Sequence, residues 1–205
     1  MTSPLKTHDK IRHAAAALFA ERGYSGTSMS RIAERVGIRK ASLYNYYSAK
    51  EELLLDLLEE SLQSWEDSCR LSLVAGGSAE ERLSGHLLAV IDFARKNPQK
   101  VGIVRLAATQ VGGKLGRRIA ALIEKHEQHS LPLLSRFFSE AKANGDVDAT
   151  DEDLLLFWSV FVDGILINQL FATPKAEHYV NRLPELWRLF WRGVSGEEPD
   201  RELKG

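Results

Sequence analysis

The sequence lacks any long uncharged hydrophobic run, and this lack argues against a helix that spans a membrane. The apolar stretch that starts at Leu154 is interrupted by Asp163, and the next one ends at Lys175. A bilayer span needs about 18 consecutive apolar residues. The first ten residues also lack the apolar core of a signal peptide. We therefore expect a cytoplasmic protein without a membrane partner.

Cysteine is almost absent, since Cys69 is the only one. A single thiol excludes an internal disulfide and a cysteine-based zinc site. The sequence also lacks a glycine-rich phosphate loop, a Gly-x-Ser-x-Gly elbow and paired carboxylates of evident orientation. His126 and His129 lie three residues apart and could share a metal, but the HExxH zinc signature needs a spacing of four. We predict no enzymatic activity, no cofactor and no metal.

The sequence also lacks a large net charge, because its 27 Lys and Arg residues nearly balance its 28 Asp and Glu residues and leave a formal net charge of −1. The balance hides an asymmetry along the chain. Residues 1–50 hold nine basic and three acidic side chains, which leaves +6, whereas residues 51–205 hold 18 and 25, which leaves −7. A basic module joined to an acidic body indicates a polyanionic partner for the module. A chance cluster of solvated lysines and arginines is the alternative interpretation.

Apolar residues recur every three or four positions, and the runs of β-branched residues typical of strands are missing. This pattern predicts an all-α protein of about nine helices. Pro132 is expected to kink or split the seventh helix, and Ser48 is expected to form a capping box with Glu51 at the start of the fourth. The predicted helices span residues 8–22, 28–36, 39–46, 48–73, 79–96, 98–110, 115–143, 150–172 and 176–194.

Residues 28–46 have the pattern of a helix-turn-helix. Two short predicted helices flank Gly37, and the second has the size that enters a DNA major groove. Thr27 or Ser28 is the expected N-cap of the first helix, and Ser28 is also an expected DNA contact. Tyr47 is expected to pack inside the domain. The second helix carries side chains able to contact phosphates or base edges, namely Arg39, Lys40, Ser42, Tyr44, Asn45 and Tyr46.

A resemblance to the DNA-binding domain of the TetR family of bacterial transcriptional regulators covers residues 18–53, LFAERGYSGTSMSRIAERVGIRKASLYNYYSAKEEL. It spans 36 of the 205 residues, and the remaining helical body resembles the family only in being all-helical and of similar size. The matching landmarks are Leu18-Phe19, Gly23-Tyr24, Thr27, Ile32-Ala33, Gly37-Ile38, Leu43-Tyr44, Tyr47 and Lys50-Glu51-Glu52-Leu53.

The resemblance implies roles for single positions. Thr27 matches the residue that caps the second helix and touches a phosphate, Lys50 matches a phosphate-contacting lysine, and Tyr44 matches a tyrosine that reaches the DNA backbone. The family's usual histidine is replaced by Tyr46, and its usual phenylalanine by Tyr47. The resemblance therefore implies the fold but not the base preference that goes with that histidine.

The last two predicted helices are apolar over more of their circumference than one core stripe needs. A chain of 205 residues cannot cover both faces, so we expect a twofold homodimer held by a four-helix bundle. A monomer that encloses one large core is the alternative. The expected interface residues are Leu155, Trp158, Val162, Ile165, Leu183, Trp187, Phe190 and Trp191.

Polar and aromatic side chains in the middle helices predict a chamber for an amphipathic small-molecule effector. Each of them could instead be structural. Arg105 interrupts an apolar stretch and could pair either an acidic ligand or a neighbouring glutamate. The expected lining residues are Trp65, His86, Phe93, Arg105, Gln110, His126, Phe137, Trp158, Phe161 and Asn168.

These features predict a TetR-like transcriptional regulator that binds double-stranded operator DNA. Residues 1–50 would form the helix-turn-helix domain, 51–195 the ligand-binding and dimerisation domain, and 196–205 a flexible tail. We expect a repressor that leaves its operator when an effector binds the body. A regulator without an effector, an activator, and a helical protein-interaction module are the alternatives.

Overall fold

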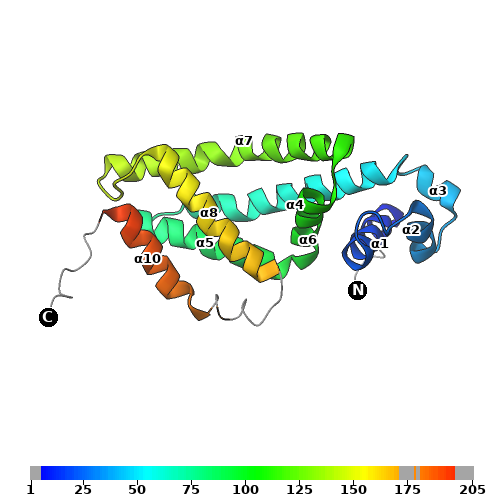
Figure 1. Ribbon diagram of the computed structural model, residues 1–205, viewed down its shortest axis with the longest axis horizontal. Coiled ribbons are helices and arrows are strands. Elements are labelled where there is room, and N and C mark those ends of the chain that lie inside the picture. Colours follow the sequence, from blue (N-terminus) through cyan, green and yellow to red (C-terminus); the bar gives the residue numbers. More distant parts are fainter. Residues whose placement is uncertain (1–5, 171–177, 179–180, 197–205) are drawn as a thin grey trace. The chain divides into compact units, whose positions relative to one another are not determined.

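The computed structural model describes residues 6–170, 178 and 181–196, and for residues 167–170 it describes the backbone alone. Over this part of the chain the fold is all-α, which confirms the predicted fold class. No helix in the described ranges is long and apolar enough to cross a membrane. The helices are α1 Thr7–Arg22, α2 Met29–Val36, α3 Lys40–Tyr44, α4 Lys50–Leu73, α5 Ala79–Lys96, α6 Pro98–Gln110, α7 Gly113–Ala143, α8 Asp151–Leu170 and α10 Leu183–Ser195 (Figure 1).

Prolines affect two of the predicted helices. α7 stays helical from Gly113 to Ala143 with Pro132 inside it, so the split is absent and the kink, the other predicted outcome, stays a prediction. One proline removes a single backbone hydrogen bond, and the many remaining turns of this helix maintain it. At the predicted helix 176–194, Arg182 has left helical geometry and α10 begins at Leu183, with Pro184 in its first turn. Residues 176, 177, 179 and 180 of that predicted helix lie outside the described residues. Proline is favoured at a helix start, where its missing N–H is not needed.

The start of α4 corrects the predicted capping box by one residue. The Ser48 N–H donates to Glu52 Oε2 at 2.9 Å, so Glu52 rather than Glu51 is the partner. Hydrogen bonds from the Ser48 hydroxyl and backbone hold the pKa of Glu52 below its usual range. The helix itself starts at Lys50, and the box therefore closes one position later than predicted.

The chain divides into two compact units, which we call unit 1 and unit 2. Unit 1 comprises Met1–Ser64 and Asn97–His126, and unit 2 comprises Trp65–Lys96 and Glu127–Gly205. Each has its own hydrophobic core. The packing thus assigns one part of α4 and of α7 to each unit. The predicted boundary at residue 50 separates a DNA-binding domain from a ligand-binding and dimerisation domain, and it stays a prediction.

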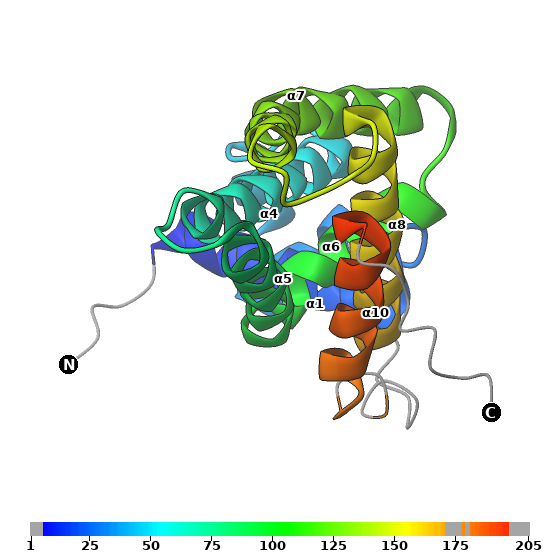
Figure 2. The ribbon, with the colours of Figure 1, turned by 90° about the vertical axis from the view of Figure 1, so that its left-hand side faces the viewer.

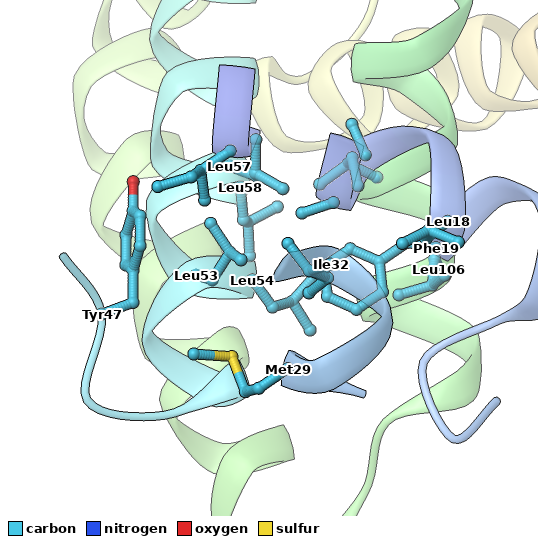
Figure 3. Close-up of a cluster of buried hydrophobic side chains, with 14 of the residues drawn as sticks. Leu18, Phe19, Met29, Ile32, Tyr47, Leu53, Leu54, Leu57, Leu58 and Leu106 are labelled. Carbon is cyan, nitrogen blue, oxygen red and sulfur yellow. The ribbon is translucent and has the colours of Figure 1, made fainter. Parts of the chain in front are cut away.

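Unit 1 is built on a core shared by α1, α2, α3, the first half of α4 and α6. α1 packs against both α2 and α6, and α2 packs against α3. Figure 3 shows side chains from α1, α2, α4 and α6 converging in this core. Burial of each large apolar side chain contributes roughly 1.5–3 kcal/mol. The side chains with almost no exposed surface are Ile11, Phe19, Ile32, Leu43, Leu53, Leu54 and Leu58.

Unit 2 has a core rich in aromatic side chains. Phe161 of α8 and Phe190 of α10 stack with ring centroids 4.6 Å apart, and Trp158 meets Phe190 edge-on at 5.6 Å. Figure 2 shows α10 running beside α8. The Trp187 Nε1–H of α10 donates to Glu80 Oε1 of α5 at 3.0 Å. These contacts make α5, α8 and α10 one packed body.

Candidate nucleic-acid interface

The helix-turn-helix consists of α2 and α3, separated by a glycine turn. Ser28 has extended backbone geometry, and its hydroxyl oxygen accepts the Arg31 N–H at 3.4 Å, so Ser28 is the N-cap of α2. Gly37 ends α2 with φ +77°, a conformation that other residues adopt only with strain. Leu43 is fully buried and anchors one face of α3 in the core. This anchor leaves the opposite face of α3 available to a partner.

The exposed face of α3 carries the predicted DNA contacts. Arg39, Lys40 and Asn45 are exposed, and the side chains of Tyr44 and Tyr46 are 44% and 46% exposed. Ser42 is half-buried, and Ser28 is exposed at the start of α2. The structure therefore groups these predicted residues around one short helix, with amide, guanidinium, ammonium and phenol groups directed away from the core.

Thr27 occupies a different position from the one that the resemblance implies. It is 2% exposed, and its hydroxyl donates to the Leu18 and Gly23 carbonyl oxygens at 3.0 and 2.9 Å. The implied cap at Thr27 is wrong, because Ser28 is the N-cap. The single hydroxyl proton of Thr27 is used inside the domain, where it ties the end of α1 to the following loop. A phosphate contact by Thr27 stays a prediction.

Lys50 joins the start of α4 to the loop between α1 and α2. Its Nζ donates to the Tyr24 and Thr27 carbonyl oxygens at 2.7 and 2.8 Å and lies 4.0 Å from the centroid of the Tyr24 ring. Burial lowers the pKa of this ammonium group. An ammonium has three N–H donors, so one remains for a phosphate beyond these two bonds. The structure gives Lys50 an anchoring role in addition to the predicted phosphate contact.

Tyr47 is buried, as predicted, and its hydroxyl has partners within the protein. The side chain is 7% exposed, and the hydroxyl donates to Asp56 Oδ2 at 2.6 Å. The His8 Nε2 atom lies 2.8 Å from the same oxygen. Burial and the neighbouring Asp56 raise the pKa of the phenol. Sequence reasoning missed Asp56 and His8; the signal for them is a tyrosine at a buried position where the resemblance implies phenylalanine.

The predicted effector residues divide between the two units. In unit 1, Arg105 and Gln110 are exposed, while His126 is 5% exposed with its Nε2 3.5 Å from Glu59 Oε1. Asn168 lies outside the residues whose side chains are described. The other six lie in unit 2, where Phe137 and Trp158 belong to the core and Trp65 and Phe161 pack against it. The remaining two, His86 and Phe93, are buried, and their rings lie 5.7 Å from Trp158 and 5.3 Å from Trp65.

His86 is the polar member of this aromatic group in unit 2. Its Nδ1 lies 3.1 Å from the Cys69 carbonyl oxygen and 3.0 Å from the Ser72 hydroxyl, and its ring is 5.7 Å from the Trp158 ring. Burial lowers the pKa of the imidazole. One ring nitrogen therefore has protein partners, and the role of the group in binding an effector stays a prediction.

The predicted interface residues mostly face the core of their own chain. Trp158, Val162, Ile165 and Phe190 are buried in unit 2, and the other four are half-buried, namely Leu155, Leu183, Trp187 and Trp191.

Other residues form the outward apolar surface of α8 and α10. Leu156, Val160 and Leu189 are 63%, 61% and 64% exposed, and Phe157 is 44% exposed. The three of these residues that belong to α8 line part of a shallow cavity of about 380 Å³, together with Gly193 of α10. Sequence reasoning missed these residues because a helix that is apolar all round does not show which face is outward. We call Leu156, Phe157, Val160 and Leu189 the outer apolar face.

Comparison with known proteins agrees with this geometry. Residues 11–57 match the family described as bacterial regulatory proteins, tetR family. The chain is 33% identical over 86 residues to the HTH-type transcriptional activator FasR of Mycolicibacterium smegmatis, an alignment that covers 42% of this chain and 39% of that protein. It is 51% identical over 45 residues to the negative transcriptional regulator IcaR of Staphylococcus epidermidis, covering 22% of this chain and 24% of IcaR. The chain thus aligns with less than half the length of these two relatives.

A likeness to solved structures extends over nearly the whole chain. The structure of AibR in complex with isovaleryl coenzyme A and operator DNA matches with a TM-score of 0.68 and 21% sequence identity. The match covers 92% of this chain and 98% of the AibR chain. At this level of identity the likeness shows a shared fold for the helical body.

Proposed function

Residues 11–57 match the family of bacterial regulatory proteins called tetR, and from this match we propose that the protein is a TetR-family transcriptional regulator that binds operator DNA. The observation that carries the proposal is the geometry of α3. Leu43 fixes one side of this helix in the core, and the exposed side presents Arg39, Lys40 and Asn45. A surplus of six positive charges in residues 1–50 supplies the attraction to phosphates.

Selection from a library of random duplexes tests this proposal. The full chain is expected to enrich a twofold-symmetric sequence whose half-sites lie about one helical turn, roughly 34–36 Å, apart or a little more. The variant Asn45→Ala is selected in parallel, since it removes one exposed amide at the end of α3 and leaves the core unchanged. Enrichment of the same sequence by both proteins would exclude Asn45 from base readout, and enrichment of none by the wild type would contradict the proposed function.

We further propose that the protein is a repressor released by a small-molecule effector. AibR is described in complex with both isovaleryl coenzyme A and operator DNA, which supports a ligand site in a body of this fold. The curated relatives include the activator FasR and the negative regulator IcaR, so both signs of regulation occur among similar proteins. An effector that prefers the form unable to bind DNA must weaken DNA binding by the same factor by which DNA weakens effector binding.

Native mass spectrometry of the purified protein, followed by DNA titration with the compound found, tests the effector part. A bound compound that lowers operator affinity supports release by an effector. A compound that raises operator affinity would instead support activation or corepression. A reporter gene placed behind the selected operator distinguishes repression from activation directly, because expression falls with a repressor and rises with an activator.

We propose that the protein acts as a homodimer held together by the outer apolar face. This face places three leucine or valine side chains and one phenylalanine on α8 and α10, more than half exposed in three cases. A contiguous exposed apolar patch is typical of a protein interaction site. A second copy is the expected partner, because a twofold operator needs two copies of α3.

A further inference from the structure

A continuous series of polar contacts connects the end of α3 to α1, α4 and α6 within unit 1. We call it the polar chain. It contains His8 and Arg12 of α1, Tyr47 after α3, Asp56 and Glu60 of α4, and Lys100 of α6. Every member belongs to the same compact unit. The members lie up to 92 positions apart in the sequence, so only the fold brings them together.

Asp56 stands at the centre of the polar chain. Its Oδ2 atom accepts the Tyr47 hydroxyl at 2.6 Å, and the same oxygen lies 3.1 Å from the Arg12 Nε. Because the one hydroxyl proton of Tyr47 goes to Asp56, the contact of 2.8 Å from His8 must be donated by the imidazole Nε2–H. The carboxylate therefore holds a residue next to α3 and a residue of α1 at the same time.

Glu60 continues the chain one helical turn further along α4. It pairs with the guanidinium of Arg12 and, through its second oxygen, lies 3.4 Å from the Lys100 Nζ. Lys100 also donates to the Ser64 hydroxyl oxygen at 2.6 Å. Arg12 is the shared member of two ion pairs, and its side chain is 21% exposed, so water screens these pairs less than it screens pairs between fully solvated groups.

The recognition helix needs such contacts because it is short. α3 has five residues, and helices of this length have little stability of their own. Its core anchor is Leu43, and the backbone N–H groups of Tyr46 and Tyr47 both donate to the Leu43 carbonyl oxygen. Tyr47, just beyond the helix, belongs to the same core, and its hydroxyl adds a polar attachment to the apolar one. Figure 3 shows the Tyr47 ring at the edge of the core with its hydroxyl directed away from Met29.

We propose that Asp56 is a positioning residue for DNA binding. It fixes the end of α3 through the Tyr47 hydroxyl, links it to α1 through Arg12, and thereby connects α3 to α6 through Glu60 and Lys100. The inference rests on the proposed DNA-binding function and adds to it the residues that set the direction of the recognition helix. None of these residues needs to contact DNA for the effect.

Two substitutions test the inference in the full chain, with the duplex that the wild type selects as the probe. Tyr47→Phe removes one hydroxyl and keeps the ring in the core, and Asp56→Ala removes the acceptor. Each variant is expected to bind the selected duplex about fivefold to tenfold more weakly, because each loses a hydrogen bond to a charged group. The double variant is expected to lose no more affinity for the selected duplex than the single variant that binds it less tightly, since both substitutions remove the same contact.

Glu59→Ala is the matched control. Glu59 lies on the same helix and is 44% exposed, against 38% for Asp56, but its partners are Lys125 and His126 of α7 and not members of the polar chain. This variant is expected to bind the selected duplex within twofold of the wild type.

Amide hydrogen exchange of the free proteins separates positioning from general stability. A positioning role predicts faster exchange of the Tyr46 and Tyr47 amides, by about fivefold, with unchanged exchange in α4 and α6. Uniformly faster exchange in all helices of unit 1 would show loss of global stability instead and would overturn the inference. Asp56→Asn keeps an oxygen acceptor and provides a milder variant if the alanine substitution prevents folding.

The possible results keep the two proposals apart. A wild type that binds no duplex contradicts the proposed function and the inference with it. A wild type that binds its duplex while Tyr47→Phe and Asp56→Ala bind equally well contradicts the inference alone. Losses that multiply in the double variant would show independent effects and would also overturn it.

Discussion

Replacing Lys50 with methionine removes the ammonium group and keeps most of the aliphatic stem. In the structure this ammonium makes two hydrogen bonds, to the Tyr24 and Thr27 carbonyl oxygens, at 2.7 and 2.8 Å. It also lies 4.0 Å from the centroid of the Tyr24 ring. The substitution therefore releases the loop that precedes α2 from the start of α4.

The magnitude follows from these contacts. A hydrogen bond from a charged donor contributes about 1.5–3 kcal/mol, and a partly exposed cation–π contact contributes about 0.5–1 kcal/mol. Lys50 is half-buried, so water can reach the two released carbonyls and recover part of the loss. We expect the free energy of unfolding to fall by about 2 kcal/mol, which lowers the melting temperature by roughly 4–8 °C for a chain of this size.

Thermal unfolding and DNA titration of the same samples measure the effect. Lys125→Met is the control, because Lys125 is 56% exposed and pairs with Glu59 at the surface, where an ion pair contributes about 0–1 kcal/mol. If Lys50 also contacts a phosphate, its variant flattens the dependence of DNA affinity on salt by about one unit. An unchanged melting temperature for Lys50→Met would refute the anchoring role, whatever the DNA titration shows.

Three further predictions concern separate parts of the chain. Lys40→Ala and Asn45→Ala should each cost about 1–3 kcal/mol at a single operator position, measured with duplexes that carry one base change, and equal losses on random DNA would contradict direct readout. Leu156→Glu should convert the dimer to a monomer, measured by light scattering. Leu88→Glu on α5, at a site that is 56% exposed, should leave the mass unchanged. A dimer in both variants would exclude the outer apolar face as the dimer interface. Burial raises the pKa of Cys69 to about 12, so the thiol should react with a disulfide reagent at least about tenfold more slowly in the native protein than in denaturant, and equal rates would show an open site.

The helix-turn-helix was predictable from the sequence because local chemistry specifies it. Gly37 needs a left-handed backbone, Ser28 caps a helix, and the apolar spacing of α2 buries Met29 and Ile32. These signals lie within a few residues of one another. The same spacing turns Arg39 and Lys40 away from the core, and both are exposed, while their contact with DNA stays a prediction.

The contacts that position α3 could not be predicted in this way. Tyr47 meets His8 and Asp56 through the fold, and Arg12 reaches Glu60 across two helices. No sequence pattern fixes which distant charges meet. A buried tyrosine hydroxyl requires an acceptor, so the sequence could indicate that Tyr47 has one. Only the three-dimensional arrangement shows that this acceptor is Asp56.

Interface prediction on α8 was limited by a different cause. The helix is apolar on nearly all sides, so periodicity does not separate the inner residues from the outer ones. Trp158 and Val162 face the core, while Leu156 and Val160 face outward. The start of α10 shows the same limit, since Pro184 is compatible both with the interior of a kinked helix and with the first turn of a new one.

The affinity of the full chain for its selected duplex and for a scrambled duplex of equal length, titrated between about 50 and 200 mM salt, tests the central claim most directly. The account predicts that both affinities fall as salt rises and that the selected duplex is bound at least about 10³-fold more tightly throughout. Equal affinities for the two duplexes, or an affinity that does not depend on salt, would contradict the claim that α3 reads DNA.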